Sequence, residues 1–289
     1  MIRKITRLVL SNLFIIQFFS CNLINKNDSD YLVIKKNKWS GEIVFYSELS
    51  SELLKQKDIN RGWSRLKKNK SVPYFKLKKR KGTVLGNYYN NQKEYLVVQL
   101  ENGRKYKWEK NYWEINDKAF PSHLSRLKIQ NEAKKKIGQF IWLNIIDADT
   151  AFINNNNLLF NKFNKVKVVG TKIYQNGSRD WPIWLEINSG DDFNVIVRYN
   201  GEKKTKGTQN YYFDENPIPK IWGKEVIRKI MSGKIEYGMK EEQVRVSIGN
   251  PHTIINTSSR HSVSEQWIYG NIVGEKKFLL FEYGELVSM

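Results

Sequence analysis

The stretch that most constrains the fold is the last third of the chain, residues 222–289. Within it, 237–251 has the pattern of one short helix. Val244 and Ile248 are four residues apart, so they share a helix face and can be buried together. Gly249 follows the last apolar residue of that face, as a left-handed helix cap would. Glu241 and Glu242 would lie in its first turn, where negative charge suits the positive end of the helix dipole. The segment therefore predicts one short helix with both ends marked.

A second helix and a set of strands are expected around this one. Apolar residues recur at helical spacing before Gly233, and they are Trp222, Val226, Ile227 and Ile230. Strand-like runs follow at 253–257, 265–270 and 277–287, and the last contains the turn sequence Tyr283-Gly284-Glu285. The terminal segment, bounded as 217–289, is therefore predicted to be α+β.

The order of these motifs resembles the SmpA/OmlA/BamE family of small envelope lipoprotein domains. The matching residues are Gly238, Met239, Glu242, Gln243, Val244, Gly249, Pro251, Glu265, Gln266, Trp267, Tyr269, Gly270, Phe281, Gly284, Leu286 and Val287. The resemblance implies two helices on a three-stranded antiparallel sheet, and a non-enzymatic module that binds other envelope proteins. Lys240 stands where the family has Ser or Thr as a helix cap, a loss that typically costs about 1 kcal/mol.

The N-terminus has the pattern of a lipoprotein signal peptide, residues 1–20. Three basic residues, Arg3, Lys4 and Arg7, precede twelve mostly apolar residues at 8–19, too few to span a bilayer, which needs roughly 20. Cys21 is the only cysteine, and Phe18-Phe19-Ser20 before it resembles a relaxed lipobox. This resemblance implies acyl chains, palmitate among them, on Cys21 and anchoring in the outer membrane. An uncleaved anchor or a buried structural cysteine are the alternatives.

Residues 21–38 are then the lipidated cysteine and a polar tether. Asn22 follows the cysteine, and in enteric bacteria the lack of Asp there favours the outer membrane. We expect the location to be the bacterial cell envelope.

The middle of the chain repeats a pattern of short strands, which predicts two β-rich modules at 39–117 and 118–216. Three pairs of segments match in order: 39–47 with 136–144, 75–86 with 160–170, and 94–108 with 180–197. The dipeptides Asn102-Gly103 and Ser189-Gly190 predict hairpin turns. The spacing is similar to that of bacterial SH3-like barrels. The predicted fold class is therefore α+β, with two SH3-like modules before the small terminal domain.

The charge of the chain is strongly positive, at +20 with a pI of about 9.7. Loss of Arg3, Lys4 and Arg7 with the signal peptide leaves +17. Lysines lie in every segment, which favours ordinary solvated surfaces, although a basic surface also attracts nucleic acid, lipid head groups or anionic glycans. Export argues against nucleic acid as a partner.

No pattern in the sequence predicts catalysis, a metal site or a cofactor. The three histidines, His123, His252 and His261, have no metal-ligand spacing, and there is no phosphate-binding glycine loop. Two carboxylate pairs are worth weighing. Asp147 and Asp149 would share a strand face, and Asp191 and Asp192 are adjacent in a turn, but solvated turn residues are the simpler interpretation.

The aromatic residues are mostly expected in cores. Tyr106 and Trp108 lie among lysines and would share one side of a strand, as would Trp267 and Tyr269, which we expect to pack on the two helices. An exposed set, with Tyr112 and Trp113, would favour a glycan or a partner strand.

The leading hypothesis is a non-enzymatic, lipid-anchored envelope protein that contacts other envelope proteins. Its candidate surfaces are the 258–264 loop and the edge of the terminal sheet. The alternative is a binding protein for peptidoglycan or an anionic glycan. A third hypothesis is a hydrolase whose site is assembled from residues that are distant in the sequence.

Overall fold

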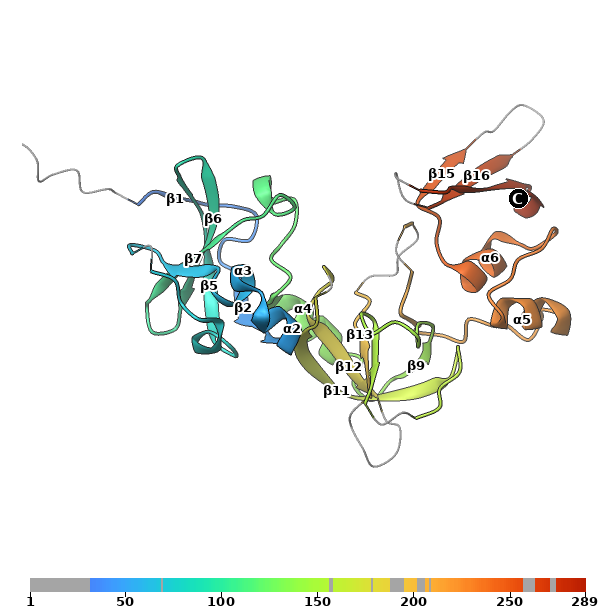
Figure 1. The fold of residues 1–289 in the computed structure, drawn as a ribbon. Coiled ribbons are helices and arrows are strands. Elements are labelled where there is room, and N and C mark those ends of the chain that lie inside the picture. Colours follow the sequence, from blue (N-terminus) through green and yellow to red (C-terminus); the bar gives the residue numbers. More distant parts are fainter. Residues whose placement is uncertain are drawn as a thin grey trace, which may run out of the picture.

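The computed structural model describes residues 32–68, 70–155, 158–177, 179–187, 195–201, 206–207, 209–256, 263–270 and 274–289. The predicted signal peptide, Cys21 and most of the predicted tether lie outside these residues, as do Ser189-Gly190, Asp191, Asp192 and His261. Two β-rich modules and a terminal α+β unit follow one another in space as they do in the chain (Figure 1). The fold is therefore mostly β with a few short helices, compatible with the predicted α+β class.

Module 1 is built on one curled antiparallel sheet with the order β4-β7-β6-β5-β2-β8, and β1 pairs with β5. Its strands are β1 (Ile34–Lys35), β2 (Ile43–Tyr46), β4 (Trp63–Arg65), β5 (Lys81–Asn90), β6 (Lys93–Leu100), β7 (Lys105–Glu109) and β8 (Leu124–Arg126). Short helical turns fill the connections: α2 (Ser51–Lys55), α3 (Lys57–Asn60), η1 (Tyr74–Lys76) and η2 (Ile115–Asp117). Apolar residues alternate along the strands, so one face of the sheet encloses the core.

Module 2 repeats the same strand order, β10-β13-β12-β11-β9-β14. Its strands are β9 (Phe140–Leu143), β10 (Phe152–Asn154), β11 (Lys165–Gln175), β12 (Ile183–Ile187), β13 (Val195–Arg198) and β14 (Tyr212–Phe213). Each strand takes the place of its counterpart in module 1, β9 for β2 and β14 for β8 among them. The internal repeat is therefore present at the level of topology.

Hydrogen bonds show that the repeat holds residue by residue at the first strand. The Gly41 N–H donates to Val84 O at 2.8 Å, and the Gly138 N–H donates to Val168 O at the same distance. A β-bulge follows Val84 and Val168 in each partner strand. Both glycines have a positive φ, near +90°, which other residues adopt only under strain. The matches of 39–47 with 136–144 and of 75–86 with 160–170 are thus confirmed.

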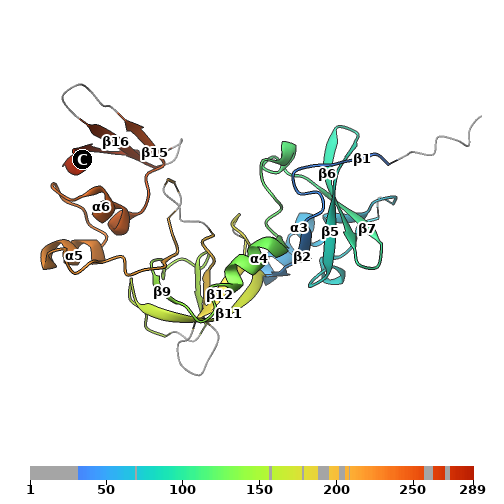
Figure 2. The ribbon, with the colours of Figure 1, turned by 180° about the vertical axis from the view of Figure 1, so that it is seen from behind.

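Sheet membership crosses the module limits read from the sequence. β8 closes the sheet of module 1 although it lies beyond residue 117, and β1 joins the same sheet from within the tether segment. β3 (Glu48–Leu49) leaves module 1 and pairs in parallel with the end of β11. The helix α4 (Leu127–Lys134) packs against β2 and β8 on one side and β11 and β12 on the other (Figure 2). These contacts join the two modules.

The terminal unit has the two predicted helices, α5 (Lys224–Met231) and α6 (Glu241–Ile248). They accompany a sheet of four strands in chain order: β15 (Thr253–Asn256), β16 (Ser264–Tyr269), β17 (Lys277–Glu282) and β18 (Glu285–Ser288). The resemblance implied three strands, whereas the structure has four. The predicted turn at Tyr283-Gly284, where both residues have positive φ, folds the last run back on itself.

The start of α6 compensates for the missing cap. Lys240 has no side-chain acceptor, but the Gln243 side-chain oxygen accepts the Lys240 backbone N–H at 2.8 Å. The Lys240 ammonium also pairs with Glu285 at 2.6 Å, which ties the helix start to β18. Gly249 ends the helix at the predicted position, but its φ of +91° and ψ of −166° are not those of the predicted left-handed cap.

Candidate anion-binding groove

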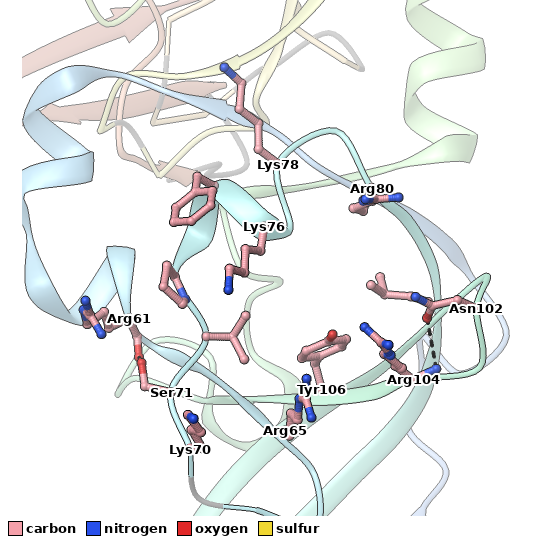
Figure 3. A pocket seen from close by; sticks show the side chains of 14 residues that line it. Arg61, Arg65, Lys70, Ser71, Lys76, Lys78, Arg80, Asn102, Arg104 and Tyr106 are labelled. Atoms are coloured by element: carbon pink, nitrogen blue, oxygen red, sulfur yellow. Dashed lines mark hydrogen bonds between the residues drawn. The ribbon is translucent and has the colours of Figure 1, made fainter.

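Basic side chains gather around an open groove of about 760 Å³ on module 1 (Figure 3). Fourteen described residues line it, and none of them is Asp or Glu. Seven carry a positive charge: Arg61, Arg65, Lys70, Lys76, Lys78, Arg80 and Arg104. We call this surface the basic groove.

One wall of the basic groove is a short hairpin that returns from β4. The Val72 N–H donates to Trp63 O at 2.8 Å, and Ser64 bridges to Ser71. Trp63 is fully buried in the module 1 core and holds this hairpin in place. The residues after it reach η1, where Phe75 stands 69% exposed at the rim. The wall therefore brings together cations from 61–80.

The opposite wall is the turn between β6 and β7. The predicted Asn102-Gly103 turn forms here, with Gly103 at φ +77° and its N–H bonded to Leu100 O at 2.9 Å. The Asn102 side chain accepts the Arg104 N–H at 3.2 Å, which fixes the backbone of Arg104 at the groove (Figure 3). Arg65 pairs with Tyr106 across β4 and β7, so the strands that carry the two walls are neighbours in the sheet. The Asn102-Gly103 turn, which the sequence predicts, thus places Arg104 at the basic groove.

The charge of the groove is largely uncompensated within the described residues. Lys78 pairs with Glu48 at 3.1 Å, and the other six cations make no ion pair within 4 Å with any residue that the structure describes. Like charges held together repel one another, and a bound anion relieves that repulsion. The buried side chains of Val72, Leu100 and Tyr106 form an apolar floor.

The side chains that line the basic groove offer positive charge and an apolar floor. The described lining holds no carboxylate, histidine or cysteine, so it supplies no ordinary general base or thiolate nucleophile. The Ser71 hydroxyl donates to Arg61 O at 2.8 Å. An open groove lined by cations suits an extended anion, whose charges meet several side chains at once.

The candidate residues from the sequence lie away from this groove and apart from one another. His123 is buried in the module 1 core, and His252 is exposed in the turn before β15. Asp147 and Asp149 are exposed in the loop after β9, so the expected shared strand face was wrong: β9 ends at Leu143. Among the described residues, no group of three possible metal ligands occurs.

The aromatic assignments are largely confirmed. Tyr106 and Trp108 are both 5% exposed and belong to the core of module 1. Trp267 is fully buried, packed with residues of α5 and α6, and Tyr269 is half-buried beside it. Tyr112 and Trp113 are exposed, and the Arg179 guanidinium lies 4.3 Å from the centre of the Trp113 ring.

The terminal sheet offers one open edge in the described part of the chain. β15 pairs only with β16. The other edge, β18, is covered, because the Gly238 N–H donates to Leu286 O and the Leu286 N–H donates to Met239 O. Most of the 258–264 loop lies outside the described residues, so that candidate surface stays a prediction.

The basic groove itself was missed by sequence reasoning. A signal existed, because cations are dense between Arg61 and Lys81, but lysines occur in every segment, so this cluster did not stand out.

None of the described helices has the length and the apolar composition that a bilayer-spanning helix needs. No known protein family, curated protein or solved structure matches the chain. The resemblance of the terminal unit to the SmpA/OmlA/BamE family therefore stays a prediction carried by its own motifs.

Proposed function

We propose that the chain is a non-enzymatic, lipid-anchored protein of the bacterial envelope that holds an anionic polymer, such as an anionic glycan, in the basic groove. The observation that carries this proposal is the set of seven cations without a carboxylate among the groove's described lining residues. The envelope location rests on the N-terminal pattern and on the proposed lipid at Cys21. The intact mass of the mature chain tests this part, because lipidation adds the mass of the acyl chains.

The fold supports a binding role. In module 1, β2 lies between the closing strand β8 and the meander β5-β6-β7, and in module 2, β9 lies between β14 and the meander β11-β12-β13. This order favours SH3-like barrels for the modules. Small barrels of this kind present loops at their ends, and the groove is built from two such loops.

The proposal predicts that reversing two groove charges weakens polyanion binding at least tenfold. The variant is Arg65→Glu with Arg104→Glu in the mature chain carrying Cys21→Ala. Each reversal replaces an attraction by a repulsion, and tenfold corresponds to about 1.4 kcal/mol. Binding is measured against polygalacturonate and polyphosphate at two salt concentrations, because screening weakens exposed charge contacts.

The matched control is Lys134→Glu with Lys135→Glu, which makes the same change in net charge at exposed residues at the end of α4. The control should bind as the parent chain does. Equal losses in both double variants would show that net charge, not the groove, drives binding. Tighter binding of single-stranded DNA than of either polymer would replace the glycan proposal by a nucleic-acid site.

A second candidate is contact with another envelope protein through the open edge of β15. An unpaired edge offers main-chain N–H and C=O groups to an added strand. Ile255, 42% exposed, lies on this edge, and Val287, 43% exposed, lies on the covered strand β18.

These two residues give a matched test of strand addition. Ile255→Lys places a charge at the open edge and should abolish an adduct formed in cells by a photo-crosslinker at Thr253, while Val287→Lys should leave it intact. Amide exchange in 253–256 should slow in the purified adduct, because strand addition hydrogen-bonds that edge. Unchanged exchange would rule out strand addition.

A further inference from the structure

A second pocket, of about 310 Å³, lies where the two modules meet. Its lining comes from 38–39 before β2, from 118–126, which runs into β8, from α4, and from 179–183, which runs into β12. The first two segments belong to module 1 and the last to module 2. The Gln175 side chain donates to Ser122 O at 2.8 Å and helps to hold the two sides together. We call this the junction pocket, and it shares no described lining residue with the basic groove.

Aromatic rings supply much of its wall. Trp39 is buried and packs edge-on against Phe120, with ring centroids 5.0 Å apart. Trp181 is 37% exposed and stacks on Tyr199 at 6.4 Å. A Cβ at Gly201 would lie 2.3 Å from the Trp181 ring, so the glycine leaves room for the indole. A fixed, partly exposed indole is suited to stacking on a ring.

Four cations surround these rings: Lys38, Lys118, Arg126 and Arg179. The described lining contains no carboxylate. Arg126 pairs with Glu42 at 3.3 Å, whereas Lys118 and Arg179 make no ion pair within the described residues. The pocket therefore favours a negatively charged ligand.

We propose that the junction pocket binds a single sugar ring that carries an acidic group. The indole of Trp181 packs on the apolar face of the ring, and Arg179 and Lys118 bind the acid. The volume is near the lower end of the range for ligand pockets, which fits one ring rather than a polymer. This site does not depend on polymer binding in the basic groove, so either proposal can fail alone.

The experiment titrates the mature Cys21→Ala chain with D-glucuronate, D-glucose 6-phosphate and D-glucose, using calorimetry and tryptophan fluorescence. We expect saturable binding of an anionic sugar and at least tenfold weaker binding of glucose. The two anions distinguish a carboxylate from a phosphate as the preferred acid. Absence of saturable binding for both anions, or equal binding of glucose, would overturn the proposal.

Variants locate the binding. Arg179→Gln changes an exposed side chain, so the fold should be kept, and it should weaken binding of the anions at least tenfold while leaving glucose unchanged. Trp181→Ala should weaken the binding of all three sugars, because each of them would pack on the indole. The matched control Arg104→Gln removes a cation from the basic groove and should bind as the parent does. Unchanged binding in Arg179→Gln would place the ligand elsewhere and overturn the assignment.

Discussion

Replacing Lys110 by alanine is expected to lower the free energy of unfolding of module 1 by about 3–5 kcal/mol. The Lys110 side chain is fully buried, and its ammonium contacts Glu94 at 2.6 Å and also Asp117. Glu94 is buried as well, at 7% exposure for the whole residue. Removing the cation leaves that carboxylate in the protein interior without its counter-charge, which is the costly half of a broken buried ion pair.

The matched control is Lys93→Ala, which breaks the exposed pair between Lys93 and Glu109 at 2.8 Å on the same sheet. Exposed pairs contribute about 0–1 kcal/mol, so the control should change stability little. Hydrogen exchange of the amides in β6 and β7 measures the local free energy of opening for both variants. Equal effects of the two variants would show that the buried pair gives no special stability. The double variant Lys110→Met with Glu94→Gln should be more stable than Lys110→Ala, because it leaves no unpaired carboxylate at residue 94.

The same network holds the segment before β2 against module 1. The Asn87 side chain donates to Glu94 at 2.9 Å and to Asp117 at 3.1 Å, and Asn37 donates to Asn87 at 2.6 Å. Burial raises the pKa of Asp117, but hydrogen bonds from Lys110 and Asn87 outweigh it and lower that pKa overall. Residue 37, at the end of the predicted tether, is therefore held against module 1.

Acid is expected to destabilise module 1 through His123, and His123→Gln should remove that part of the pH dependence. Burial lowers the pKa of His123 to about 3. The Trp63 indole N–H donates to its Nε2 at 3.0 Å, which requires a neutral ring. The unfolded chain, with a pKa near 6.5, takes up the proton first as the pH falls. The stabilisation is complete above pH 6.5 and is lost towards pH 3, at about 1.4 kcal/mol per pH unit.

Urea unfolding followed by tryptophan fluorescence measures the free energy of unfolding from pH 7 to pH 4. The expectation concerns the slope of this free energy against pH, which should be smaller in His123→Gln than in the parent chain. His123→Gln keeps a side-chain acceptor and cannot titrate, although it loses ring contacts with Trp63 and Trp108 and is less stable at every pH. The exposed His252→Gln should keep the slope of the parent chain. A slope in His123→Gln equal to that of the parent would show that another group carries the effect.

Local patterns were enough for the terminal unit and for the repeat. Val244 and Ile248 share a face of α6, Gly249 ends it, and Tyr283-Gly284 turns the chain between β17 and β18. Each of these features depends on residues a few positions apart, where periodicity and turn chemistry act directly. Tyr106 and Trp108 were placed in the core for the same reason, because alternation along a strand decides which side a residue faces.

The basic groove, the Lys110 network and the burial of His123 were decided only by the tertiary structure. Arg65 meets Arg104 because β4 pairs with β7, and Lys110 meets Glu94 across two adjacent strands. His123 is enclosed because β8 returns to pair with β2, not with the module that follows it. Such pairings join residues distant in the chain, and their register depends on the packing of the whole core. The sequence by itself therefore determined the elements and their repetition, whereas long-range strand pairing decided which charges and rings share a site.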